Sequence, residues 1–316
     1  MTEAEALPRR RGGWFFNNPF NNPVAIKELR GRMRGARAFI MLSVYLLLIV
    51  GFTLLLYVIS TASQDVFGFS SGGQVGRALF TGIVGLQLLL VTFIAPALTA
   101  SAISGERERQ TYDLLRTTLL PSHKLVIGKL FSALSYLFLL LIAAIPLQSI
   151  AFLFGGVAEI EVLIAFVILS VTTIALGATG IYFSAAQNRT LAANITTYAM
   201  TLFITIGLPI ATLILTLLFS SLLSAGGADT SAEVQIALLY GLVALAATNP
   251  LMAASLTQSW LINKQSAFFF YETVTSTTGV IQVPILSPWI LFGAVYLLVA
   301  LILVIRTVQR VRSIEE

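Results

Sequence analysis

Long apolar segments alternate with short polar ones along most of the chain. Most of the apolar segments reach the roughly 20 residues that a helix needs to cross about 30 Å of hydrocarbon at about 1.5 Å per residue. The pattern therefore predicts an all-α, polytopic membrane protein. Seven segments contain no Asp, Glu, Lys, Arg or His: 38–60, 78–104, 130–154, 162–184, 191–219, 236–262 and 288–305.

The sixth apolar segment differs from the others because Thr248-Asn249-Pro250 lies at its middle. Proline lacks a backbone N–H and disfavours a helical conformation in the residue before it, so we expect a break at Asn249 and Pro250. The two halves, 236–247 and 251–262, would each be about 18 Å long as helix, too short to span a membrane alone. The segment is thus predicted to form a re-entrant external helical hairpin before the last span.

The distribution of basic residues tests this six-span topology, because cytosolic loops are enriched in Lys and Arg. With six spans, 17 basic residues face the cytosol and two, Arg77 and Lys264, face outward. With seven spans the numbers become 15 and 4. The six-span model with both termini in the cytosol is preferred. We expect a single domain over 1–316: a cytosolic tail and amphipathic helix at 1–37, a membrane bundle at 38–305, and a cytosolic tail at 306–316.

Composition narrows the function. The chain is 57% hydrophobic and only 10% charged, whereas a soluble domain carries about 25% charged residues. The net charge of +5 comes from basic residues that flank apolar spans, which indicates membrane topology and no nucleic-acid partner. The chain has no P-loop motif, no Cys and a single His, so neither ATP binding through a P-loop nor a zinc site is expected.

The predicted spans also lack the ionisable residues that ion-coupled carriers and intramembrane enzymes place at membrane depth. We therefore expect a chain that is not an enzyme and binds no cofactor itself. If it moves a substrate, the energy would come from another chain.

Residues 22–37 predict a basic amphipathic helix that starts with Asn22 and Pro23. Its apolar residues, among them Leu29 and Met33, fall near one face. Such a helix would lie in the membrane interface before the first span, either as a topological anchor or also as a contact for a cytosolic partner. Its charged residues include Lys27, Glu28, Arg30 and Arg34.

The loop 105–129 is the most distinctive polar segment. It combines a mixed-charge start with a helical leucine pattern that ends at Pro121, and its early acidic residues suit the helix dipole. The leucines need an apolar cover, which could be the membrane interface or a groove on a partner. The residues of interest are Glu106, Arg107, Glu108, Arg109, Thr111, Leu114 and Leu115.

Two of these motifs resemble those of ABC-2-type transporter permeases. Asn22, Pro23, Lys27, Glu28, Leu29 and Arg30 resemble the amphipathic connecting helix of that family. The segment from Glu106 to Thr118, followed by Pro121 and Gly128-Lys129, resembles its first cytosolic coupling helix. Many members have Gly where this chain has Gln110. The resemblance also covers the layout of the whole chain.

The resemblance implies a permease subunit of an ATP-driven exporter in a prokaryotic cytoplasmic membrane. Such permeases pair with a second permease copy and with separate P-loop ATPase subunits, which hold ATP and Mg²⁺. Leu114 and Leu115 would then be apolar anchors in the ATPase groove, with Glu106, Arg107 and Arg109 as rim ion pairs. The lipid bilayer is the remaining partner. The alternative is a membrane scaffold or assembly subunit that does not transport.

Overall fold

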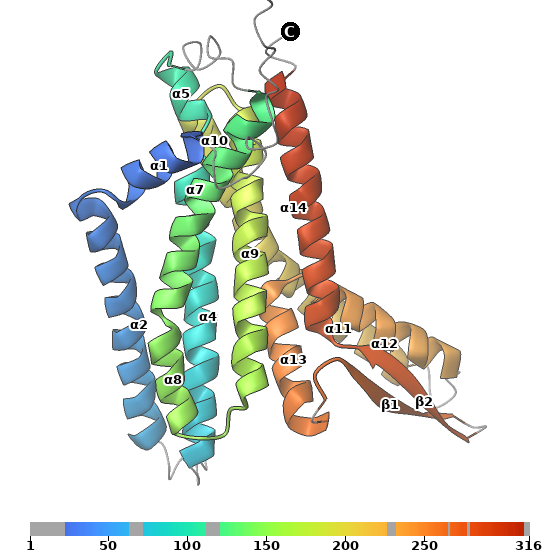
Figure 1. Ribbon diagram of the computed structural model, residues 1–316. Helices are drawn as coiled ribbons and strands as arrows, with labels where there is room; N and C mark the ends of the chain where they lie inside the picture. Colours follow the sequence, from blue (N-terminus) through green and yellow to red (C-terminus); the bar gives the residue numbers. More distant parts are fainter. Residues whose placement is uncertain are drawn as a thin grey trace, which may run out of the picture.

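The computed structural model describes residues 23–62, 72–111, 121–225, 232–264, 266–276 and 279–312 (Figure 1). This part of the chain is mostly helical. It has six helical stretches that are long and apolar enough to cross a membrane, which makes the protein a multi-pass membrane protein. They are formed by α2 (Ala36–Ala62), α4 (Gly72–Thr99) with α5 (Ser104–Glu108), α7 (Ser122–Ala143) with α8 (Ile145–Leu153), α9 (Glu159–Ala186), α10 (Thr190–Leu202) to α11 (Leu208–Ala225), and α14 (Pro288–Arg312).

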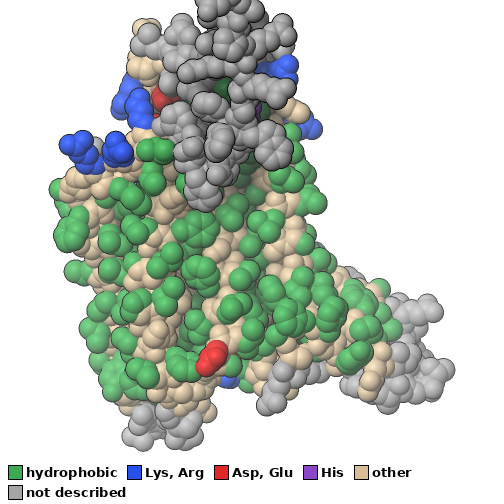
Figure 2. All heavy atoms as spheres, in the orientation of Figure 1, with side chains coloured by type: hydrophobic (Ala, Val, Ile, Leu, Met, Phe, Trp, Pro, Cys, Tyr) green, Lys and Arg blue, Asp and Glu red, His purple; other side chains and the backbone are tan. Residues whose placement is uncertain are grey.

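The helix α9 lies at the centre of the bundle and packs against α4, α7, α10 and α14. Its small residues permit this, because a helix without bulky side chains lets neighbours approach closely. At Gly177, for example, an added Cβ would lie 3.0 Å from a methyl group of Leu134 on α7. The outward faces of the surrounding helices are apolar, as Figure 2 shows, and suit contact with lipid tails.

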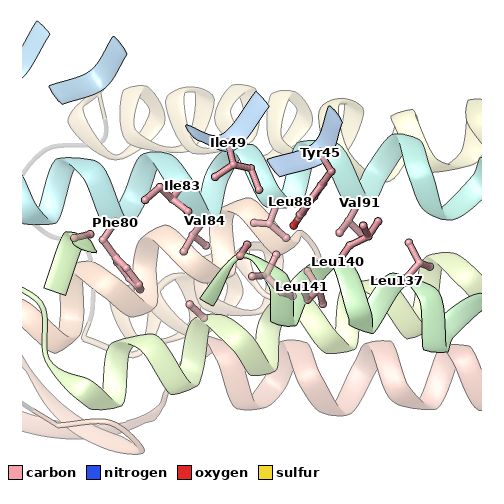
Figure 3. Close-up of a cluster of buried hydrophobic side chains, with 14 of the residues drawn as sticks. Tyr45, Ile49, Phe80, Ile83, Val84, Leu88, Val91, Leu137, Leu140 and Leu141 are labelled. Atoms are coloured by element: carbon pink, nitrogen blue, oxygen red, sulfur yellow. The ribbon is translucent and has the colours of Figure 1, made fainter. Parts of the chain in front are cut away.

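A second packed core lies between α2, α4 and α7. In Figure 3, Ile83 and Leu88 of α4 are drawn with Ile49 of α2 and with Leu140 and Leu141 of α7. All five side chains are buried. Such contacts at nearly full packing density hold the helices at fixed distances, so the polar residues at the helix ends are brought to fixed positions too.

The chain is broken between α12 (Ala232–Ala246) and α13 (Pro250–Lys264), at the place where the sequence predicts a break. The buried Asn249 caps α13: its Oδ1 accepts hydrogen bonds from the backbone N–H groups of Leu251 (2.8 Å) and Met252 (3.2 Å). Asparagine at an N-cap satisfies donors that the first helical turn leaves free.

The side-chain nitrogen of Asn249 connects the break to a neighbouring span by hydrogen bonds. Its Nδ2 donates to the backbone oxygens of Ile204 (2.5 Å) and Thr205 (3.4 Å), in the π-helical turn Phe203–Gly207 between α10 and α11. Pro209 follows that turn and has no N–H to offer the carbonyl four residues earlier, which belongs to Thr205. Asn249 thus supplies the donor that Pro209 lacks.

The expectation of an all-α fold is wrong for one segment. Residues Phe269–Ser276 and Gly279–Leu286 form antiparallel strands β1 and β2, with Phe269 opposite Leu286. The hairpin packs against α12 and α13, where the Phe270 ring centroid lies 3.8 Å from that of Trp260. The physical reason is the local sequence, since its β-branched and aromatic residues favour extended backbone.

Candidate functional site at the α5 end of the bundle

One end of the bundle, which we call the α5 end, is formed by α1 (Pro23–Met33), α5 and the start of α7. Figure 1 shows α1 running across the bundle at this end, nearly perpendicular to α2. The chain turns between them at Gly35, whose φ of 116° lies in the region that favours glycine. The helix α1 packs against α7, with Ala25 buried in the contact.

The centre of this site is Lys129, a lysine that is only 3% exposed. Its Nζ lies 2.7 Å from Oε1 of Glu106 on α5 and 3.3 Å from Oε1 of Glu28 on α1. A buried ammonium group is stable only when it is paired and hydrogen-bonded, and two carboxylates meet that need here. Lys129 therefore joins the two motifs that the sequence singles out, although they are far apart along the chain.

The helix α5 is also fastened to the junction of α9 and α10. The Nη1 of Arg107 donates to the backbone oxygen of Ala185 (3.1 Å) and to Oδ1 of Asn188 (3.4 Å). Oε2 of Glu108 accepts hydrogen bonds from Oγ1 (2.5 Å) and the backbone N (3.3 Å) of Thr190. A displacement of α5 must therefore pull on both helices.

One serine of α9 forms hydrogen bonds with the turn that leads into α5. Oγ of the buried Ser184 accepts hydrogen bonds from the backbone N–H groups of Ile103 (2.8 Å) and Ser104 (3.0 Å). These groups lie at the start of α5, where a helix has unpaired donors. The serine thus fixes where α5 begins.

Arg32 fastens α1 to the end of α4. Its Nη2 donates to the backbone oxygen of Leu98 (3.0 Å). Burial lowers the pKa of Arg32 below its ordinary value, and the nearby Glu28 carboxylate offsets part of this effect. With Lys129, Arg32 gives α1 two charged attachments to the bundle.

Three further basic residues of the predicted helix 22–37 lie at the surface. Lys27, Arg30 and Arg34 are exposed, and so is Met33, at 43%. In Figure 2, Lys and Arg side chains gather at this end of the molecule. These side chains are free to meet lipid headgroups or a partner.

Only some of the predicted docking residues lie in the described part of the chain. Arg109 and Thr111 are exposed, and Oγ1 of Thr111 donates to the backbone oxygen of Glu106 (3.2 Å). Leu114 and Leu115 lie at 112–120, outside the described residues. Gln110 has a φ of 59°, a left-handed conformation that favours glycine. This is the position at which many ABC-2 permeases have Gly.

Sequence reasoning found Glu28 and Glu106 but missed what they bind. Lys129 falls at the edge of an apolar segment and was interpreted only as part of Gly128-Lys129; Arg32 and Ser184 were not singled out as site residues. A lysine directly beside a predicted span is a usable signal, because a helix that begins earlier than predicted buries it and burial requires a partner. In the described ranges no cluster of three or more possible metal ligands is found. No known family model and no curated protein sequence matches this chain.

Proposed function

We propose that this protein is the permease subunit of an ATP-driven ABC exporter of the ABC-2 type, in a prokaryotic cytoplasmic membrane. The observation that carries the proposal is the contact of Lys129 with Glu28 and Glu106. It joins the segment that resembles a connecting helix to the segment that resembles a coupling helix. A transporter driven from outside needs such a connection between its docking surface and its spans.

The proposed coupling starts at the segment 106–120. A separate P-loop ATPase would bind it, with Leu114 and Leu115 as apolar anchors and Arg109 at the rim. When ATP closes the ATPase dimer, the segment moves. The contacts of Arg107 and Glu108 with the α9–α10 junction, and of Glu106 with Lys129, would pass the movement to the spans.

The backbone at Gln110 supports the same assignment independently. Its φ of 59° is a conformation that glycine adopts without cost. The glycine that many family members carry there therefore suits the turn that this chain makes. Gln110 therefore differs from those family members in residue type, but its backbone has a conformation that glycine adopts.

The topology that belongs to this function places the α5 end and both termini in the cytosol. The Lys and Arg side chains that Figure 2 shows at that end support it, since basic residues favour the cytosolic side.

The helices α12 and α13 have 15 residues each and are about 22 Å long. Both are too short to span a membrane, which supports a re-entrant pair. A second permease copy would complete the pathway.

The proposal is tested by co-expression with the P-loop ATPase encoded nearest to its gene. Leu114→Asp and Leu115→Asp should each abolish co-purification of the ATPase, because a buried charge in an apolar groove costs several kcal/mol. Leu191→Asp is the matched control: it makes the same substitution at an exposed leucine outside 106–120. The control should keep the complex.

Two results would overturn the assignment. Unchanged co-purification in both leucine variants would exclude docking through 106–120. ATP hydrolysis by the ATPase that is the same with and without the permease would favour a scaffold that does not couple to ATP.

A further inference from the structure

At the opposite end of the bundle a cavity of about 310 Å³ lies between α4, α9 and α13, with Pro209 of α11 at its edge. Its wall is mostly apolar, with Val84 of α4, Ile168 of α9 and Leu261 of α13 among the lining residues. Pockets that bind small molecules have volumes of about 300–1,000 Å³. This cavity is therefore large enough for an alkyl chain.

Two buried polar atoms belong to residues that line the cavity and have no hydrogen-bond partner in the described part of the chain. They are Oε2 of Glu161, whose residue is 6% exposed, and Oγ1 of Thr257, whose residue is 2% exposed. Other buried helical threonines, such as Thr172 and Thr179, donate to the carbonyl four residues earlier. A buried polar group without a partner costs about 1–3 kcal/mol. A ligand that supplied both partners would recover that cost.

A second cavity, of about 470 Å³, adjoins the first, because Glu161 and Leu261 line both. Its wall includes Arg77 and the segment 156–158. Nη2 of Arg77 lies 3.8 Å from Oε1 of Glu161, and its Nε donates to the backbone oxygen of Gly156 (2.9 Å). At Glu161 the first cavity is thus joined to one that contains a charged pair, Arg77 and Glu161.

We propose that these two cavities form a binding site for a lipid-like molecule with one alkyl chain and an uncharged, hydroxyl-bearing head, such as a monoacylglycerol. The chain occupies the apolar cavity and the head lies against Glu161. A hydroxyl group both donates, as Oε2 of Glu161 requires, and accepts, as Oγ1 of Thr257 allows. Arg77 already offsets the charge of Glu161, so a cationic head gains less. The site does not depend on the proposed transport function.

The chain carries its own reporter for this site. Trp260 lies on α13 beside Leu261 of the cavity wall, and Trp14 and Trp289 are the other two tryptophans. The full chain with Trp14→Phe and Trp289→Phe is placed in phosphatidylcholine nanodiscs. It is then titrated with a monoacylglycerol that carries bromine on its chain. Quenching of Trp260 should saturate. A brominated alkane and a brominated alkylammonium of the same chain length should bind about tenfold more weakly or without saturation.

Two variants test whether the ligand binds in the cavity. An added Cβ at Gly85, which lines the cavity, meets no atom within 4 Å, so Gly85→Leu should fill the space without disturbing the fold and abolish saturable quenching. Thr257→Val, which removes one hydroxyl, should weaken binding about fivefold. Thr179→Val is the control, because Thr179 is a buried threonine outside the cavity wall.

Three outcomes would overturn the proposal. The first is saturable quenching that persists unchanged in both Gly85→Leu and Thr257→Val. The second is equal affinity for the alkane, which would mean that the head is not recognised. The third is preference for the alkylammonium, which would mean that Glu161 selects a cation. ATPase association is not part of the measurement, so failure here leaves the permease assignment untouched.

Discussion

The two ends of the bundle use buried ionisable groups in different ways. At the α5 end, Lys129 touches Glu106 at 2.7 Å and Glu28 at 3.3 Å. At the other end, Arg77 and Glu161 are 3.8 Å apart, and one oxygen of Glu161 has no partner in the described part of the chain. The first arrangement uses its charges to fasten helices together. The second leaves one carboxylate oxygen without a partner, in a residue that lines two cavities.

The difference arises from what packs over each end. The helix α1 lies on α7 and brings Glu28 to Lys129. At the opposite end the turn after α8 approaches α4 closely: Gly156 has a φ of 80°, and a Cβ there would collide with the backbone of Gly73. This turn gives Arg77 a carbonyl to bind but does not fill the space between α4 and α13.

The largest effect is expected from Lys129→Met. The variant keeps the length and apolar stem of the side chain but leaves Glu28 and Glu106 without their cation. Breaking a buried ion pair by removing one partner costs about 3 kcal/mol. The free energy of unfolding, measured by SDS titration in mixed micelles, should fall by that amount.

Lys27→Met is the matched control for this change, because Lys27 is an exposed lysine on the same end of the molecule. It should leave the free energy of unfolding unchanged. Equal effects of the two substitutions would show that Lys129 does not fasten the α5 end.

Arg77→Met should have a smaller effect at the opposite end. Arg77 is 32% exposed along its side chain and lies farther from its carboxylate than Lys129 does, so less of the interaction is lost. The variant also loses the hydrogen bond to Gly156. We expect a loss of about 1.5 kcal/mol in the same titration, with Arg34→Met as the exposed control. A loss as large as that of Lys129→Met would remove the contrast between the ends.

The smallest effect is expected from Thr190→Val, which removes one of the two hydrogen bonds to Glu108. Both residues are at the surface, where such contacts contribute little to global stability. The unfolding midpoint should not change, but amide hydrogen exchange should speed up at the α5–α10 contact. Faster exchange throughout α9 would contradict this expectation, because it would show that the contact also stabilises the interior of the bundle.

Sequence patterning was sufficient for the spans and for the break before Pro250, because both depend on local chemistry. Hydrocarbon thickness sets the length of an apolar helix, and a proline lacks a backbone N–H and disfavours helix in the residue before it, as at Asn249. The same reasoning missed the strands 269–276 and 279–286. No element was predicted for these residues, although their run of aromatic and β-branched side chains, from Phe269 to Thr275, is a strand signal.

The candidate site was only half visible in the sequence. Glu28 and Glu106 stood out because their motifs are local. Lys129 did not, because its role depends on two carboxylates from other parts of the chain. The cavity at Glu161 was hidden for the same reason, since the residues that line it come from four helices.

The sequence by itself determined that this chain is a multi-pass membrane protein, because the cost of burying charge and backbone groups in hydrocarbon acts on each segment separately. Tertiary structure alone decided which ionisable groups are paired and which are left beside a cavity. Pairing depends on distances of a few ångströms between residues far apart along the chain, and only the packing of α1, α4, α7, α9 and α13 sets those distances.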